Sequence, residues 1–322
     1  MPKSLVFNDE GIPSKIKSQI IDHDPENTKF IWTNLKAGDK ISKVLPDVVD
    51  RSKSFTEDLL EEQRPRIQVY QTLEDNDDTY SVIVLSFPTN FILKKDDYVL
   101  QVSFVFLENR LYTASQRESS IFSKIMSKCI SQKINFTPIS FFVFLISEML
   151  EMSINALENV EKLIDNSERK MLSGGLEKGW LANLLQLKGR LYDASTSVRA
   201  DIEHIRELVS GKVPNLDIEK IEDHILDRVL FLMDLIQEQR EDLTNMINLH
   251  LAIASNIMNR QFYWLTILGA LLIIPTVISS IWGMNLDDVP QINFWGMLLV
   301  ISIMTGVAGV ILKLLLPKPM IN

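Results

Sequence analysis

The sequence has a single cysteine, Cys129, and only four histidines among its 322 residues. One cysteine cannot form a disulfide within its own chain, which fits a reducing cytosolic compartment. The histidines, at positions 23, 204, 224 and 250, have no paired spacing and no cysteine partners, so a structural zinc site is not expected. The glycines at 174, 175 and 179 lack the spacing and the Ser/Thr of a phosphate-binding loop. We therefore expect neither an enzyme nor an organic cofactor.

Charge is almost absent from the C-terminal part of the chain. Beyond Arg260 the only charged residues are Asp287, Asp288, Lys313 and Lys318, whose charges sum to zero. The formal net charge of −9 therefore belongs to the part before them, which is expected to be an acidic, water-soluble body that does not bind nucleic acid.

Two stretches in the C-terminal part carry no charge at all. Residues 262–286 and 289–312 are 25 and 24 residues long, and about 20 apolar residues are enough to cross the hydrocarbon core of a bilayer. Residues 1–13 are polar and contain no long apolar run, so no signal peptide is expected there. The sequence predicts a multi-pass protein of the cell membrane with transmembrane helices over 262–286 and 294–316.

The charges that flank the two spans predict their orientation. Arg260 precedes the first span. Lys313 lies near the end of the second span, and Lys318 follows it. The connection over 287–293 carries only acidic charges. Because positive charge stays on the cytoplasmic side, we expect both termini in the cytosol, including the tail over 317–322, and the loop outside.

The first third of the chain has the character of an α/β domain. β-branched and aromatic residues are enriched, and apolar and polar residues alternate in several cases, in five segments: residues 29–35, 67–73, 80–86, 99–106 and 110–114. Polar, helix-compatible segments such as 40–60 lie between them. A cytosolic α/β domain over 1–135 is the natural prediction.

Helical periodicity begins at Pro138. Residues 139–173 contain no glycine or proline and are expected to form a helix, which the glycine pair at 174–175 ends. A second helix is expected over about 176–209. The two form an antiparallel helical pair within 136–215. The apolar run at 139–146 has only eight residues, which is too short to span a membrane, so packing against the sheet or the next helix is expected.

A third helix should be much longer. Apolar residues recur in steps of three and four, interrupted by Gln239 and His250, and neither glycine nor proline occurs over 216–268. This spacing is typical of a coiled-coil seam. The stalk helix over 216–261 should continue into the first span, and residues 217–281 would extend about 98 Å at about 1.5 Å per residue. Such a stalk needs partner helices from its own chain and from other copies.

The first span has one face of mostly small or polar residues: Phe262, Thr266, Gly269, Ile273, Thr276, Ser280 and Gly283. Small residues on one face usually allow close helix packing. The same pattern suits the lining of a pore. Periodicity alone leaves both interpretations open.

The outer end of this span carries Gly283-Met284-Asn285, followed by a short loop and the second span. This arrangement resembles the CorA family of divalent-cation channels, whose signature is Gly-Met-Asn at that place. Further matches are Asn259-Arg260, Pro275-Thr276, and an acidic pair at 57–58 followed by Arg64-Pro65-Arg66. The resemblance covers essentially the whole chain.

The resemblance implies an α+β membrane protein that assembles as a homopentameric funnel. The α/β domains would lie in the cytosol, the stalk helices would continue as pore-lining first spans, and the second spans would lie outside them. The implied activity is influx of Mg²⁺, with Co²⁺ and Ni²⁺ as further cargo, down the electrochemical gradient.

Mg²⁺ dehydrates reluctantly and usually keeps several waters, so neutral dipoles suit its capture. A ring of Asn285 carbonyls would form such a selectivity filter at the outer mouth, where Gly283 permits the end of the helix. Met284 is expected to pack, because a thioether is too soft for Mg²⁺. The resemblance implies these pore positions: Asn259, Phe262, Leu265, Gly269, Ile273 and Thr276. Leu265 and Ile273 suit apolar constrictions, although packing remains an alternative for Phe262 and Leu265.

The resemblance also implies regulation by Mg²⁺ bound between neighbouring cytosolic domains. By motif, Asp58 with Glu57 beside it is the candidate on the α/β domain, and Asp223 or Asp227 on the stalk is the partner, near the position where His224 aligns with the family acid. In the outer loop, Asp287 and Asp288 stand where the family usually has a Glu-containing segment. They would attract cations electrostatically or else merely cap the loop in water.

Two other functions remain open at this stage. One is Zn²⁺ transport, because a zinc-transporting branch shares the architecture and the outer loop here departs from the magnesium pattern. The other is a membrane-anchored cation sensor that does not conduct. The retention of Gly269, Thr276 and Asn285 in register favours a conducting protein.

Overall fold

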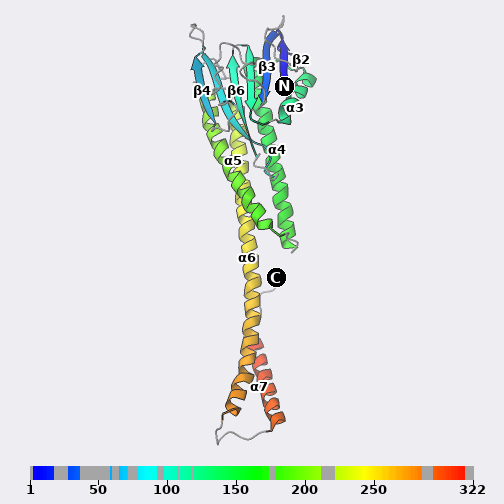
Figure 1. Cartoon of the computed structure of the whole chain (residues 1–322), viewed down its shortest axis with the longest axis vertical. Coiled ribbons are helices and arrows are strands. Elements are labelled where there is room, and N and C mark those ends of the chain that lie inside the picture. Colours follow the sequence, from blue (N-terminus) through cyan, green and yellow to red (C-terminus); the bar gives the residue numbers. More distant parts are fainter. Residues whose placement is uncertain are drawn as a thin grey trace. The chain divides into compact units, whose positions relative to one another are not determined.

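The protein is described here by a computed structural model, which covers residues 3–17, 28–36, 59, 65–71, 79–92, 98–107, 109–117, 119–173, 178–211, 222–284 and 293–315. The chain divides into two compact units, Met1–Asn245 and Met246–Asn322. The first unit contains a sheet with helices, and the second contains the end of a long helix, α6 (Glu222–Trp282), together with α7 (Phe294–Leu315) (Figure 1).

The first unit contains a seven-stranded sheet of order β2-β1-β3-β7-β6-β5-β4. Strands β3 and β7 run parallel, and every other neighbouring pair is antiparallel. The strands are β1 (Lys3–Asn8), β2 (Pro13–Lys17), β3 (Thr28–Lys36), β4 (Arg66–Gln71), β5 (Thr79–Pro88), β6 (Val99–Leu107) and β7 (Arg110–Ser115). The five strands expected from the sequence correspond to β3 through β7. The polar segment expected over 40–60 lies outside the described residues, apart from Leu59.

Two strands and one helix were not expected. Strands β1 and β2 fall in the N-terminal stretch that was read as polar, and α3 (Ser120–Gln132) lies where no helix was predicted. In β1 the three consecutive residues Leu5, Val6 and Phe7 are all buried, because both faces of the sheet are covered there. These three are the whole apolar run of β1, shorter than the run of about four to eight residues that indicates a buried strand, and this weakened the signal for β1.

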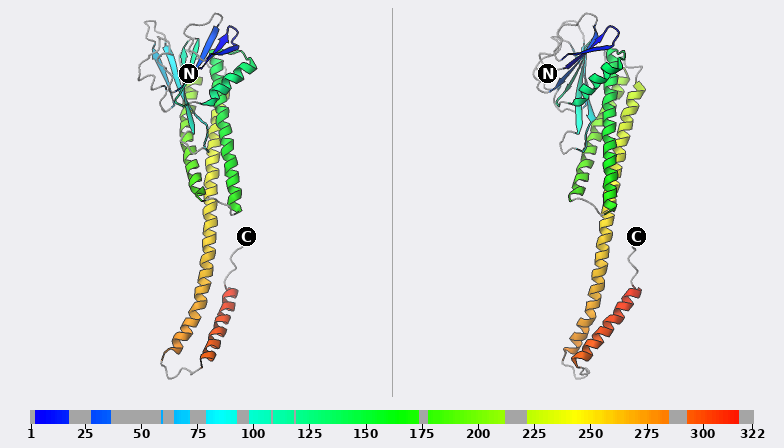
Figure 2. Two further views of the ribbon diagram at one scale, coloured as in Figure 1. Left: turned by 45° about the vertical axis from the view of Figure 1, so that its right-hand side comes forward. Right: turned by 90° about the vertical axis from the view of Figure 1, so that its right-hand side faces the viewer.

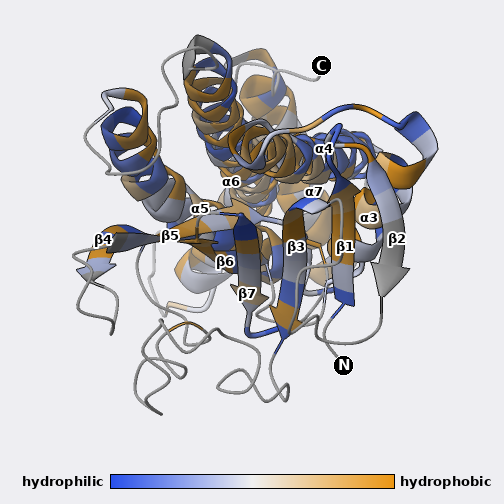
Figure 3. Ribbon diagram, turned by 90° about the horizontal axis from the view of Figure 1, so that it is seen from above, coloured by the Kyte–Doolittle hydropathy of each residue, from blue (hydrophilic) through white to orange (hydrophobic). Residues whose placement is uncertain are grey.

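One face of the sheet packs against helices α3, α4 (Pro138–Leu172) and α5 (Trp180–Val209), which lie together on that side (Figure 3). Aromatic rings dominate this layer. The ring of Phe141 lies 4.8 Å from that of Phe7 and 5.1 Å from that of Trp32, and the ring of Phe142 lies 5.1 Å from that of Phe104. The opposite face has its own apolar cluster, which includes Leu59, Tyr80 and Tyr112.

Helix α4 begins where the sequence predicts and packs as expected. Thr137 is its N-cap, with Pro138 in the first turn and a capping box formed with Ser140, an arrangement that satisfies two backbone donors. By length and composition alone α4 is apolar enough to cross a membrane, but half of its most apolar window is buried inside the protein. The expectation that its apolar run packs against the sheet is confirmed by the ring contacts of Phe141 and Phe142.

Helix α5 is attached to the sheet by two buried polar residues. Both carboxylate oxygens of Asp201 accept from the backbone N–H of Ser86 at 3.2 Å, and Nη1 of Arg190 donates to the carbonyl of Phe91 at 2.8 Å. Burial raises the pKa of the Asp201 carboxyl well above its usual range, opposed by that hydrogen bond. These contacts connect α5 to β5 and to the segment after it.

The apolar seam of α6 is covered by its own chain only in part. Ile225, Val229, Leu232, Ile236, Leu243 and Met246 are all buried. Farther along, Ile257 is 55% exposed. Gln239, which interrupts the seam in the sequence, is buried as well, and its Oε1 has no hydrogen-bond partner. An amide in an apolar seam is a cost to stability.

The turn between β1 and β2 packs on the backbone of Phe136, and Gly11 in this turn allows the contact to be tested. It has a φ of +78°, and a Cβ built on it would lie 2.1 Å from the carbonyl oxygen of Phe136. We expect Gly11→Ala to reduce the free energy of unfolding by about 2 kcal/mol or more, because both the backbone conformation and the contact oppose a side chain. Thermal unfolding of the full-length protein in detergent, followed by circular dichroism, measures the loss.

The control is Gly189→Ala in α5, where a Cβ meets nothing within 4 Å. Alanine is favoured over glycine inside a helix by about 1 kcal/mol, so this variant should be as stable as the wild type or more so. Equal stability of the Gly11→Ala variant and the wild type would contradict the packing of this turn on Phe136.

Candidate functional site

In the second unit, α7 covers one face of α6. Ile278 is only 7% exposed, and a Cβ built on Gly309 of α7 would lie 3.7 Å from Cδ2 of Leu271. Leu271, Ile274, Pro275 and Trp282 are half-buried on the same face. The two helices lie side by side in both views of Figure 2, where the end of α6 is orange and α7 is red.

The residues predicted to line a pore lie on the other side of α6. Phe262, Leu265 and Ile273 are 57%, 63% and 61% exposed, and Asn259, Gly269 and Thr276 are exposed as well. Since a helix turns by about 100° per residue, these positions point away from the face that contacts α7. The single chain therefore leaves the whole predicted pore face uncovered.

Two hydroxyls on this exposed face are already satisfied within the helix. Thr266 donates to the carbonyl of Phe262 at 2.9 Å, and Thr276 donates to the carbonyl of Leu272 at 2.8 Å. Each hydroxyl oxygen keeps lone pairs that can accept a hydrogen bond. The face can therefore offer acceptors to the water shell of a cation without breaking any helical bond.

Helix α6 ends just before the signature residues. Gly283 follows its last residue and donates to the carbonyl of Ser279 at 2.9 Å, and Met284 donates to that of Ile281 at 3.2 Å. A Cβ on Gly283 would lie 3.2 Å from the Ser279 oxygen, so a larger residue would be crowded here. Met284 is 56% exposed. Asn285, Asp287 and Asp288 lie outside the described residues.

The predicted regulatory residues are only partly described. Asp223 lies in the first turn of α6, and Asp227 lies one turn further and is exposed. Glu57 and Asp58 lie outside the described residues. Within the described ranges no group of three or more His, Cys, Asp or Glu residues is placed to hold a metal ion.

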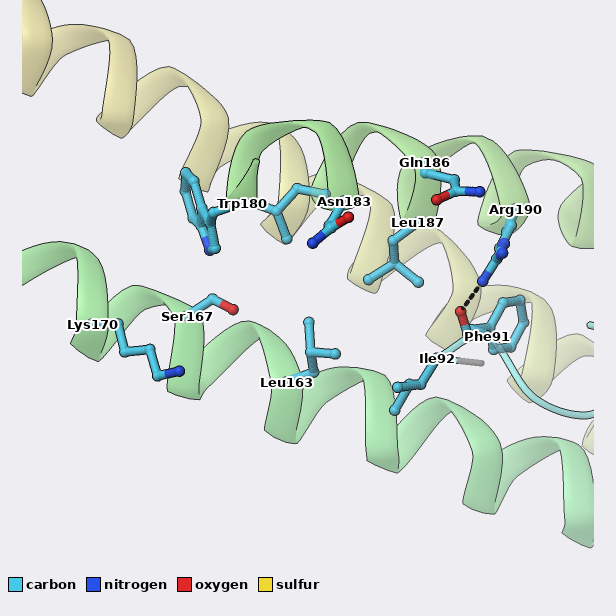
Figure 4. Close-up of a pocket in the computed structure, with 11 residues that line it drawn as sticks. Phe91, Ile92, Leu163, Ser167, Lys170, Trp180, Asn183, Gln186, Leu187 and Arg190 are labelled. Carbon is cyan, nitrogen blue, oxygen red and sulfur yellow. Dashed lines mark hydrogen bonds between the residues drawn. The ribbon is translucent and has the colours of Figure 1, made fainter. Parts of the chain in front are cut away.

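A cavity of about 260 Å³ lies between α4, α5 and the segment after β5. In Figure 4, Leu163 of α4 and Leu187 of α5 point toward each other across it, and Arg190 reaches the carbonyl of Phe91 at one end. Its two ionisable lining residues are Lys170 and Arg190. None of the residues predicted to handle cations lines this cavity.

Comparisons with known proteins identify the family to which this fold and sequence belong. The family model described as "CorA-like Mg2+ transporter protein" matches residues 49–316. The chain belongs to this family. The cobalt/magnesium transport protein CorA of Thermotoga maritima is 24% identical over 84% of this chain and 79% of its own length.

Solved structures of CorA-like proteins share the fold. The CorA magnesium transporter from Methanocaldococcus jannaschii covers 97% of this chain and 95% of its own, with a TM-score of 0.75 and 20% identity. The cytoplasmic domain of ZntB from Vibrio parahaemolyticus covers 79% of this chain and 97% of its own, with a TM-score of 0.58 and 11% identity. At these identities the likeness concerns the fold alone.

Sequence reasoning did not find which face of α6 is covered by α7, nor the buried hydroxyl of Thr305 on α7. The small residues of α7 gave a weak signal for close packing, since Gly306 and Gly309 lie near Thr305 in the sequence. The partner of that packing, Leu271, could only be found from the structure.

The exposed face of α6 can be tested with thiol chemistry. The native Cys129 is buried, and burial raises the pKa of its thiol to about 12, so the wild type should not react with a hydrophilic, membrane-impermeant thiol reagent. We expect Ser280→Cys, on the exposed face, to be modified in proteoliposomes. Ile278→Cys, two residues away and facing α7, should stay protected. Mass spectrometry measures both, and equal protection of the two thiols would contradict a water-lined face.

Proposed function

We propose that this chain forms a homopentameric channel of the cell membrane that admits Mg²⁺ down its electrochemical gradient, with Co²⁺ and Ni²⁺ as further cargo. The observation that carries the proposal is the uncovered face of α6, which has small and hydroxyl-bearing residues, points away from α7 and leads to Gly283 at the end of the helix. Membership of the CorA-like family supports it.

In this proposal the part of α6 beyond Arg260 and the whole of α7 cross the membrane, with both chain termini in the cytosol. Among the described residues, both helices are long and apolar enough to do so. Five copies would place their exposed α6 faces around one axis. Asn259, Phe262, Leu265, Gly269, Ile273 and Thr276 would line the path, with Leu265 and Ile273 as apolar constrictions that close by dewetting.

At the outer mouth, a ring of Asn285 side chains would receive hydrated Mg²⁺. Amide carbonyls bind the waters of the ion's shell and do not require the dehydration that Mg²⁺ resists. Asp287 and Asp288 would raise the local cation concentration by their negative potential. A divalent ion gains roughly 4.6 kcal/mol on entering at about −100 mV, twice the 2.3 kcal/mol per charge, so no other energy source is required.

The cytosolic part of the chain is acidic, and we infer that Mg²⁺ regulates the channel by binding between its acidic residues at subunit interfaces. The four candidate ligands are Glu57, Asp58, Asp223 and Asp227. Carboxylates that face each other across an interface repel unless a cation lies between them. Internal Mg²⁺ would therefore hold neighbouring cytosolic units together in a closed state, and its loss would release them.

Flux through the purified protein tests the proposal directly. Proteoliposomes that contain a Mg²⁺-sensitive dye should show uptake driven by an inside-negative potential, with Zn²⁺ added outside as a competitor. Zn²⁺ transport in preference to Mg²⁺ would favour the zinc alternative. Absence of flux for every divalent ion would favour a cation sensor that does not conduct.

We expect Asn285→Ala to abolish Mg²⁺ uptake and leave the oligomer intact, because the ring of carbonyls that receives the hydrated ion is lost. Size-exclusion chromatography with light scattering checks the oligomer. The matched control is Asn293→Ser. Oδ1 of Asn293 accepts from the N–H of Gly296 at the start of α7, and serine is an equally good N-cap, so its flux should equal that of the wild type. Unchanged uptake by the Asn285→Ala variant would remove the ring from the mechanism.

We also expect Asp58→Ala to weaken the protection of the cytosolic unit by Mg²⁺ against proteolysis, because one ligand of the interface ion is removed. Limited trypsin digestion over a Mg²⁺ series measures the midpoint of protection, which should shift to higher concentration. The control for the loss of one negative charge from the cytosolic unit is Asp193→Ala. Asp193 lies on α5 and accepts an exposed hydrogen bond from the hydroxyl of Tyr98. An identical midpoint for the Asp58→Ala variant and the wild type would place the regulatory ion elsewhere.

A further inference from the structure

Pro275 leaves one backbone carbonyl of α6 without its helical partner. It lies inside α6, and proline has no N–H to donate to the carbonyl four residues earlier, that of Leu271. In a helix this carbonyl points along the axis toward the level of residue 275. A carbonyl within a bilayer costs several kcal/mol when nothing donates to it. The Leu271 carbonyl therefore needs a donor from outside its own helix.

Thr305 of α7 carries a hydrogen-bond donor that has no acceptor. Its Oγ1 is buried and has no hydrogen-bond partner. Three other hydroxyls of the same unit, those of Thr266, Thr276 and Ser302, donate to the carbonyl four residues back in their own helix, which is the usual arrangement for such residues. Thr305 does not use this local acceptor.

The packing of α6 on α7 brings these two groups to the same level. Gly309 lies against Leu271, and Thr305 is one turn before Gly309 on α7. Because α7 returns antiparallel beside α6, one turn back on α7 corresponds to one turn forward on α6, which is Pro275. The other residues that α6 turns toward α7 here, Leu271, Ile274 and Ile278, have only hydrocarbon side chains.

We propose that the Thr305 hydroxyl, which has no partner in the present structure, turns to donate a hydrogen bond to the Leu271 carbonyl freed by Pro275, and that this bond fixes α7 to the back of α6 at the proline. Thr305 is then a positioning residue. It touches no ion, but it sets the angle of α6 at Pro275, directly behind Ile273 and Thr276 on the exposed face. The functional half of this proposal rests on the proposed channel function, whereas the hydrogen bond does not.

The substitution Thr305→Val changes the melting temperature in opposite directions, depending on whether the hydroxyl makes the bond. Valine has the same shape and no hydroxyl. If the bond is made, the variant should melt about 2 °C below the wild type in detergent, and Thr305→Ser should melt with the wild type. If the hydroxyl is instead buried without a partner, valine removes a desolvation cost and raises the melting temperature, which would overturn the proposal. Ser302→Ala, which removes an exposed hydroxyl bonded within α7, is the control.

A second background isolates the carbonyl. In Pro275→Ala the restored N–H pairs with Leu271 within the helix, so adding Thr305→Val should then cost no stability. An equal loss in both backgrounds would show that Thr305 acts by packing alone. If the Pro275→Ala protein does not assemble, the comparison of valine and serine at position 305 still decides the question.

The flux assay tests the functional half. We expect Thr305→Val to shift the internal Mg²⁺ concentration that halves influx by about threefold, the change that corresponds to one interhelical hydrogen bond in a membrane, and Thr305→Ser to leave it unchanged. A valine variant that melts lower but conducts and closes as the wild type would confine Thr305 to stability. Absence of wild-type flux would contradict the proposed function without touching the melting comparison.

Discussion

Helix α6 offers more apolar and small-residue surface than the helices of its own chain cover. Ile225 through Met246 on the seam are buried by the same chain, but Ile257 and the face that carries Phe262 and Ile273 are more than half exposed. Exposed apolar surface of this extent marks an interface with a membrane or with another protein. One end of α6 is held by α4, because Arg228 donates to Glu151 and to the carbonyl of Ser147, and α7 supports the back of its other end. What is left uncovered is the whole circumference of α6 over 254–262 and, beside α7, the face that points away from it.

The face of α6 that points away from α7 is chemically uneven, and this limits what can occupy it. Leu265 and Ile273 alternate with Gly269 and with threonines whose hydroxyls already donate within the helix. A purely apolar face would suit lipid, and a charged face would suit bulk water. A mixed face of this kind suits a narrow column of water that must be opened and closed. This is the physical basis for placing an ion path there and placing lipid against other surfaces.

Much of the fold could be predicted from the sequence where one residue pattern had one explanation. Strands β3 to β7 are rich in β-branched and aromatic residues, and helix α4 has a cap and a breaker that act locally, as at Thr137 and Pro138. Strand β1 was missed because its apolar run, Leu5 to Phe7, is shorter than the run of about four to eight residues that indicates a buried strand. The contacts of Asp201 with Ser86 and of Arg190 with Phe91 join positions 115 and 99 residues apart, and no local pattern reports them. For α6, periodicity left packing and pore lining open, and only the position of α7 separates the two faces.

The buried amide of Gln239 has a consequence for how α6 aligns with the other helices of its own chain. A seam of leucines and isoleucines alone would tolerate a shift of α6 by one heptad with little change in buried area. Gln239 is 4% exposed within the single chain, and its Oε1 has no partner, so a shift that moved the amide into a wholly apolar environment would carry a further cost. The next residue, Arg240, lies over the ring of Tyr192 on α5. Together these two side chains favour one alignment of α6 along α5 over its heptad-shifted alternatives.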